Sequence, residues 1–160
     1  MAVKEPGITA SPNRGLALTV GAILAIWGVL GFFFAGDGGH AFFGKDGGYL
    51  WGVFLVNPAL CLVWTLLAAA MLIGGLGTTI GSRNLNLLAG IVLLVLALYG
   101  FLFMDTSANV FALNAVDNGF NAIVGFVLLV TALAADRENL RALRADRDNL
   151  DALRAEAAHS

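Results

Sequence analysis

Four long apolar stretches without a charged side chain occupy most of the chain between Arg14 and Asp136. They cover residues 15–36, 47–82, 84–104 and 118–135. A helix of roughly 20 apolar residues crosses a hydrocarbon core about 30 Å thick. Because lipid offers the backbone no hydrogen-bond partners, a crossing segment satisfies its own backbone groups by forming a helix. The sequence therefore predicts an all-α membrane protein with four transmembrane helices.

The composition agrees with a location in the lipid bilayer. Charged residues make up 12% of the chain and the mean hydropathy is +0.83, whereas about a quarter of the residues of a soluble domain are charged. The net charge of −2 gives no reason to expect nucleic acid as a partner. Cys61 is the only cysteine, so the chain forms no internal disulfide.

The second apolar stretch, with 36 residues, is too long for one crossing. Asn57-Pro58 divides it, because Asn caps helices well and Pro suits the first helical turn. We expect helices at about 15–35, 58–76, 85–104 and 118–135, after an N-terminal segment of residues 1–14. Residues 47–56, which include Tyr49 and Trp51, are expected to lie at the level of the outer headgroups.

The distribution of Lys and Arg predicts how the chain is oriented. Eight of these residues lie before the first helix, between the second and third, or after the fourth, and only Lys45 lies on the other side. Positive residues are enriched in cytoplasmic segments. We therefore expect a multi-pass protein of the bacterial plasma membrane with both termini in the cytoplasm.

The two halves of the chain share an Asn that follows an apolar residue just before a helix. Asn57 precedes the second helix and Asn114 precedes the fourth, 57 positions later. Both helices are expected to start on the same side of the membrane. This pattern predicts a parallel repeat of two units with two helices each, rather than an inverted repeat.

These segments also resemble those of a small actinobacterial membrane family known only as domain of unknown function 4383. The matching residues are Asn57-Pro58 and Leu113-Asn114-Ala115-Val116-Asp117-Asn118. The resemblance covers about residues 14–135 and implies a four-helix fold without an established activity. Members of the family typically carry histidines in the first turns of the second and fourth helices. Leu60, Trp64 and Asn121 stand there in this chain, so the resemblance gives no support for a metal, haem or proton role.

Asn57 and four polar residues at the start of the fourth helix form the candidate site. The spacing i, i+3, i+4 and i+7 places those four on one helix face: Asn114, Asp117, Asn118 and Asn121. One interpretation is an outward-facing polar pocket or cation site. The other, which we favour, is structural: Asn114 or Asp117 caps the helix, and Asn121 bonds to a neighbouring helix or loop.

No catalytic constellation accompanies this polar cluster. The sequence contains no motif of a serine, metallo- or phosphate-binding enzyme. His40 among scattered carboxylates provides fewer convergent ligands than a zinc site needs. We therefore expect no catalytic residue, no metal and no cofactor.

The tail, residues 136–160, is predicted to be a charged cytoplasmic helix. It contains two copies of the pattern A-D-R-x-N-L-x-A-L-R, without Gly or Pro. Two interpretations remain open: a solvated helix, or one that docks on a partner through four leucines: Leu140, Leu143, Leu150 and Leu153. Five arginines and six acidic residues between 136 and 156 argue against binding of anionic lipid as its main role.

The sequence thus favours a non-catalytic accessory or structural protein of the membrane. Its expected partners are the lipid bilayer and either a larger membrane complex or further copies of itself. The alternative is a small outward-facing binding or transport protein with a polar pocket where the second and fourth helices begin. No carboxylate or basic residue lies deep in any apolar stretch, which argues against an ion relay across the bilayer.

Overall fold

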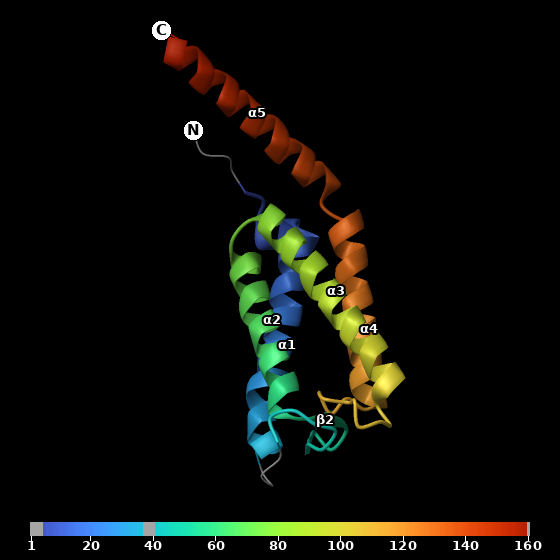
Figure 1. Ribbon diagram of the computed structural model, residues 1–160. Coiled ribbons are helices and arrows are strands. Elements are labelled where there is room, and N and C mark those ends of the chain that lie inside the picture. The colour runs from blue at the N-terminus through green and yellow to red at the C-terminus, as the bar shows by residue number, and fades with distance from the viewer. Residues whose placement is uncertain (1–4, 37–40, 160) are drawn as a thin grey trace.

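The computed structural model describes residues 5–36 and 41–159 (Figure 1). Parts of three sequence predictions fall outside the described residues: the beginning of the N-terminal segment (1–4), the loop containing His40 (37–40) and the end of the tail (160). The described helices, in chain order, are η1 (Ile8–Ala10), α1 (Pro12–Gly36), α2 (Pro58–Leu76), α3 (Thr79–Phe103), α4 (Ala115–Ala134) and α5 (Arg137–His159).

Four of these helices, α1 to α4, are long and apolar enough to cross a membrane. Their most hydrophobic windows have hydropathies between 1.7 and 2.5, and at most 44% of the residues in any of them are buried within the chain. The remaining apolar surface is therefore free to contact lipid. The prediction of a mostly helical chain with four helices long and apolar enough to span a membrane is confirmed, and α5 is an additional helix beyond the fourth.

Three helices begin earlier than the sequence predicted: α1 at Pro12, α3 at Thr79 and α4 at Ala115. The largest difference is in α3, where the Thr78 hydroxyl caps the helix by accepting from the Gly81 N–H at 3.0 Å. The charged Arg83 is then inside the helix. Its Nε donates to the Ala132 carbonyl at 2.8 Å. The positive charge of Arg83 therefore offsets the partial negative charge at the C-terminal end of α4.

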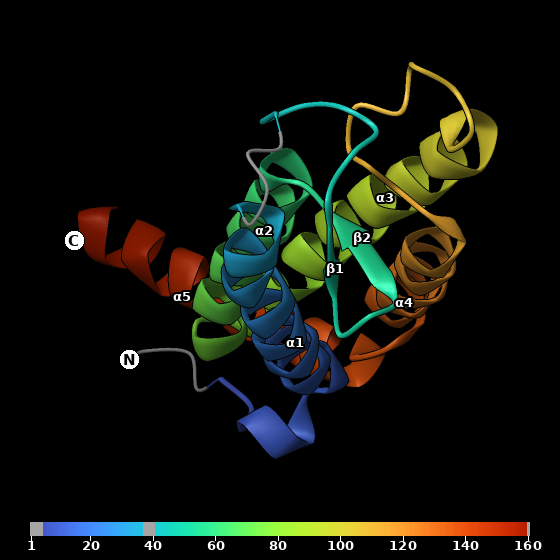
Figure 2. The ribbon, with the colours of Figure 1, turned by 90° about the horizontal axis from the view of Figure 1, so that it is seen from below.

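The four helices pack as two close pairs, α1 with α2 and α3 with α4 (Figures 1 and 2). Glycines allow the close approach within each pair. A Cβ added at Gly90 would lie 2.9 Å from the Gly125 carbonyl oxygen, and one at Gly125 would lie 2.9 Å from that of Gly90. In the other pair, Gly21 faces Leu72 and Gly28 faces Thr65. These small residues therefore serve packing within the chain.

Residues 47–56, for which the sequence predicted no regular structure, form a β-hairpin. Strands β1 (Gly48–Leu50) and β2 (Phe54–Val56) pair antiparallel, with Gly48 opposite Val56. The turn between them has positive φ at both Trp51 and Gly52, which suits the twist of a hairpin. Figure 2 shows the hairpin lying across one end of the helices. Leu50 and Val56 are fully buried there, because the hairpin covers the interior of the bundle.

Candidate functional site

Asn57 and Asn114 occupy equivalent positions at the start of α2 and α4. The Asn57 side-chain oxygen accepts from the Leu60 N–H at 2.9 Å, and that of Asn114 accepts from the Asp117 N–H at 2.9 Å. Asp117 completes a capping box by accepting from the Asn114 N–H at 2.9 Å. Both asparagines therefore cap their helices, as the structural interpretation of the sequence predicted.

Each asparagine also bonds to the other half of the chain. Nδ2 of Asn57 donates to the Val110 carbonyl at 2.9 Å and to that of Gly44 at 2.9 Å. Nδ2 of Asn114 donates to the Val53 carbonyl at 2.8 Å. Val53 and Val110 are themselves 57 positions apart, the same distance as the two asparagines. The two contacts are thus reciprocal, and they tie the two helix pairs together at the hairpin end.

The other three residues of the predicted cluster are fully buried beneath the hairpin. Asp117 also accepts from the Leu55 N–H of β2 at 3.3 Å. Asn121 accepts from Nε1 of Trp64 at 3.2 Å, a contact between α4 and α2. Asn118 points at Gly100 of α3, where a Cβ would overlap its side-chain amide. The structure therefore buries four of the five predicted residues and leaves Asn114 partly exposed.

Three side-chain atoms of this cluster have no hydrogen-bond partner among the described residues: Oδ1 of Asp117, Oδ1 of Asn118 and Nδ2 of Asn121. Aromatic rings line the neighbouring interior. Phe120 stacks on Trp27 with 6.2 Å between ring centroids, and it meets Trp64 edge-on at 5.9 Å. Two free acceptors and one free donor could hold a small polar molecule. The described residues contain no cluster of three His, Cys, Asp or Glu side chains that could hold a metal ion.

Asp136, between α4 and α5, is the centre of a second polar cluster, which the sequence analysis missed. One carboxylate oxygen accepts from the Ser11 hydroxyl at 3.0 Å, the Asn13 N–H at 3.0 Å and the Asn13 amide at 2.8 Å. The other accepts from Asn139 at 2.7 Å, and the same amide donates to the Ala10 carbonyl at 3.0 Å. Asp136 therefore caps the start of α1 although it is more than a hundred residues away in sequence.

These bonds determine the ionisation of Asp136. Burial alone would raise its pKa, but the hydrogen bonds from the Asn13 N–H and from the Asn139, Asn13 and Ser11 side chains lower the pKa below its usual value. Its backbone has φ of 59°, a left-handed conformation that Asp and Asn adopt more readily than other residues with a side chain. The carboxylate is thus held ionised at the junction of α1 and α5.

The comparison with family models shows to which protein family the chain belongs. A model described as domain of unknown function (DUF4383) matches residues 14–134. This chain belongs to that family. The DUF4383 match extends from the first turn of α1 to the end of α4, so it contains both asparagine caps and stops before Asp136 and α5. No curated protein and no solved structure shows significant similarity to the chain.

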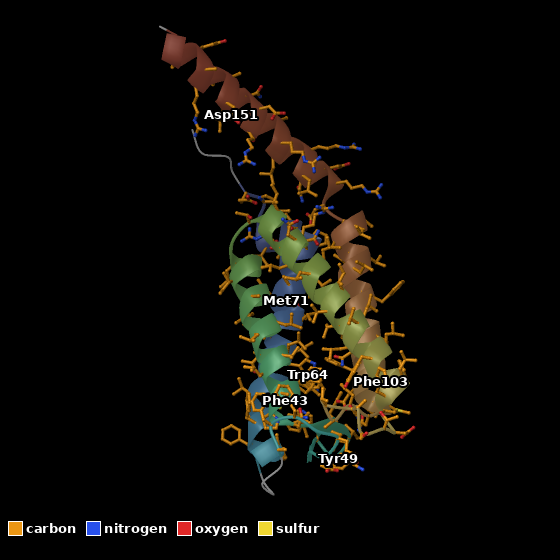
Figure 3. All side chains as sticks on the ribbon, viewed as in Figure 1. Phe43, Tyr49, Trp64, Met71, Phe103 and Asp151 are labelled. Carbon is orange, nitrogen blue, oxygen red and sulfur yellow. The ribbon has the colours of Figure 1, made fainter. Side chains whose placement is uncertain are left out.

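Helix α5, beyond the DUF4383 region, carries the four leucines proposed for docking. Leu143 is 7% exposed and lines a small pocket together with Pro6 and Gly7 of the N-terminal segment. Leu140 and Leu150 are partly buried, whereas Leu153 is 61% exposed. Figure 3 shows Asp151, next to this distal part, far from the membrane helices. The leucines therefore divide into an inner part facing the chain itself and an outer part that remains accessible.

Proposed function

We propose that this protein is a non-catalytic accessory protein of the membrane, whose bundle anchors α5 for contact with a larger membrane complex or with further copies of itself. The observation that carries this proposal is the hydrogen-bonded junction around Asp136, which connects α5 to the start of α1. A tail held in this way projects from the membrane in a defined direction. Its distal part, with Leu150 and Leu153, remains available to a partner.

We further propose that the membrane domain arose as a parallel repeat of two helix pairs. Two arginine contacts support this, beside the reciprocal asparagine contacts. Arg14 of α1 donates to the Gly75 carbonyl at the end of α2 at 3.0 Å, as Arg83 of α3 does to Ala132 at the end of α4. The arginines are 69 positions apart and their acceptors 57. Ten of these 12 residues correspond to the longer first loop, which contains the hairpin, and two to the positions of the arginines within α1 and α3.

Both termini are proposed to lie in the cytoplasm of a bacterial cell, with the hairpin outside. In a Cys61→Ala background, single cysteines at positions 4 and 160 should be labelled by a membrane-impermeant maleimide only after the cells are opened. A cysteine at position 45 should be labelled in intact cells. Labelling of either terminus in intact cells would overturn the orientation, which rests on the asymmetric distribution of Lys and Arg.

The tail provides the test of the accessory role. Leu150→Ser with Leu153→Ser should remove a docked partner from the purified full-length protein, since each leucine buried in an interface contributes about 1.5–3 kcal/mol before ordering costs. Leu140 and Leu143 stay unchanged, because Leu143 packs against the chain itself. The measurement is co-purification from native membranes at equal expression, with Ala152→Ser and Ala155→Ser as the matched control on exposed positions of the same helix.

Retention of the partner by wild type and by the alanine control, together with its loss from the leucine variant, supports the proposal. Equal recovery from all three forms would place the contact elsewhere. If no partner co-purifies with any form and protease removes the tail in native membranes, α5 is a solvated extension and the docking role fails.

The alternative function, a small outward-facing binding or transport protein, is favoured by one observation. Asp117, Asn118 and Asn121 each have a buried polar atom without a partner among the described residues, and such an atom costs about 1–3 kcal/mol unless something satisfies it. A small polar ligand retained through purification, and lost when Asn118 is replaced by Leu, would support this alternative. The hairpin that covers these residues argues for the structural role.

A further inference from the structure

A basic pocket lies where α4 joins α5. It has a volume of about 170 Å³, and its lining combines four arginines with two leucines: Arg83, Arg137, Arg141, Arg144, Leu133 and Leu140. Three of the arginines belong to α5 and recur at i, i+4 and i+7, so they project from one face of that helix. Figure 3 shows nitrogen-tipped side chains projecting from the first half of α5, beside the end of α4.

None of the four arginines of this pocket forms an ion pair with a described carboxylate. No carboxylate contributes to its lining. Among the described residues the one ion pair is Arg154–Asp151, farther along α5. The tail has nearly equal numbers of arginines and acidic residues, but its charges are unevenly distributed. Three of its arginines gather with Arg83 of α3 at the junction. An anion is the ligand that such a cluster attracts.

Arg83 is already held in position for this role. Its Nε donates to the Ala132 carbonyl at 2.8 Å, and its two terminal nitrogens have no hydrogen bond to the described residues. The start of α5, at Arg137, adds the positive end of a helix dipole. Guanidinium groups bind phosphate with paired hydrogen bonds, so several of them around one small pocket match a phosphate group.

The position of the pocket distinguishes a lipid from a soluble anion. Helix α4 ends its membrane-spanning part at Ala134, and Leu133 in its last turn is 57% exposed. The arginines thus stand at the level where headgroups begin, and Leu133 offers apolar contact on the side of the acyl chains. Basic pockets of this kind beside spanning helices bind anionic headgroups.

We propose that this pocket binds the phosphate headgroup of an anionic phospholipid, in the leaflet on the side of the chain termini. The inference is independent of the accessory role, since it concerns the proximal part of α5 and not the distal leucines. A bound lipid would join α4 and α5 across the basic junction and relieve the repulsion among the four arginines.

The test uses the full-length protein in a neutral detergent, titrated with dioleoylphosphatidylglycerol or with zwitterionic dioleoylphosphatidylcholine and measured by native mass spectrometry. Wild type should bind phosphatidylglycerol more tightly than phosphatidylcholine. Arg141→Gln with Arg144→Gln should weaken that binding about 25-fold, at about five-fold per arginine. Arg147→Gln with Arg154→Gln removes the same charge from exposed positions outside the pocket and should weaken it by about two-fold at most.

A third arm adds inorganic phosphate at the concentration of the lipid and should not displace phosphatidylglycerol. Displacement would assign the pocket to a soluble anion and overturn the lipid proposal. Equal binding of the two lipids by wild type, or equal losses in the two double variants, would also overturn it. Thermal unfolding of both variants checks their fold, and the comparison of the two lipids on wild type needs no variant.

Discussion

Replacement of Asn57 by alanine is expected to lower the free energy of unfolding of the membrane domain by about 2–4 kcal/mol. Loss of a helix cap costs about 0.5–2 kcal/mol. The substitution also leaves the Gly44 carbonyl without its side-chain donor, whereas the Val110 carbonyl keeps the Gly44 N–H at 2.9 Å. A buried polar group that loses its partner costs about 1–3 kcal/mol. Asn57 is fully buried, so water cannot replace these bonds at no cost. The measurement is thermal or denaturant-induced unfolding in detergent, followed by circular dichroism.

Alanine at Asn114 should cost less, about 0.5–2 kcal/mol, because that residue is only partly buried and its bond to Val53 is exposed. Asn84→Ala is the matched control: Asn84 is exposed on α3, and its side chain should contribute little. The structural role of the two asparagines would be contradicted if both cap substitutions left stability unchanged yet abolished a bound ligand. That result would establish the outward-facing pocket in place of the structural role.

Replacement of Asp136 by asparagine is expected to destabilise the protein by about 2–3 kcal/mol and to release α5 from the bundle. Asparagine keeps the left-handed backbone but has only one side-chain oxygen, whereas both oxygens of Asp136 accept hydrogen bonds. Whichever way the amide turns, its NH₂ group meets donors, either from Ser11 and Asn13 or from Asn139. Hydrogen bonds to a charged group contribute about 1.5–3 kcal/mol. Protease cleavage of α5 should therefore become faster than in wild type, at equal integrity of α1 to α4.

The same residue predicts how stability depends on pH. Since the folded-state pKa of Asp136 is lowered, its contribution is fully present above the usual Asp pKa of about 3.9. It is lost as the pH falls through the folded-state pKa. The difference in melting temperature between wild type and Asp136→Asn should thus be constant near neutrality and shrink below about pH 4. A difference that stays the same down to pH 3 would show that the Asp136 carboxylate does not stabilise the fold.

The parts of this fold that follow from local sequence could be predicted, and the parts that need distant contacts could not. The four helices able to span a membrane follow from apolar length alone. The asparagine caps follow from residue type and position, because a cap bonds to a backbone N–H three residues later. Asp136 gave no such signal, since its partner Asn13 lies 123 residues away.

The start of helix α3 and the hairpin also depend on contacts with residues distant in sequence, so local sequence did not predict them. The expected start of α3 near residue 85 followed from the charge of Arg83, whereas the structure gives that charge a partner on α4. The hairpin could not be predicted from Tyr49 and Trp51, because its position depends on the end of α1. There a Cβ on Gly48 would overlap the Phe34 carbonyl. The tail was correctly predicted as a helix, but the burial of Leu143 depends on the N-terminal segment.

The central proposal, that this chain works as part of a membrane assembly, is tested most directly by the mass of the native particle. Membranes containing the protein at its natural level would be extracted into polymer-bounded lipid discs and analysed by native mass spectrometry. The chain alone has a mass of 16.7 kDa. We expect a protein mass that includes a second protein or several copies of this chain. A single chain of 16.7 kDa with only lipid bound to it would contradict the accessory role.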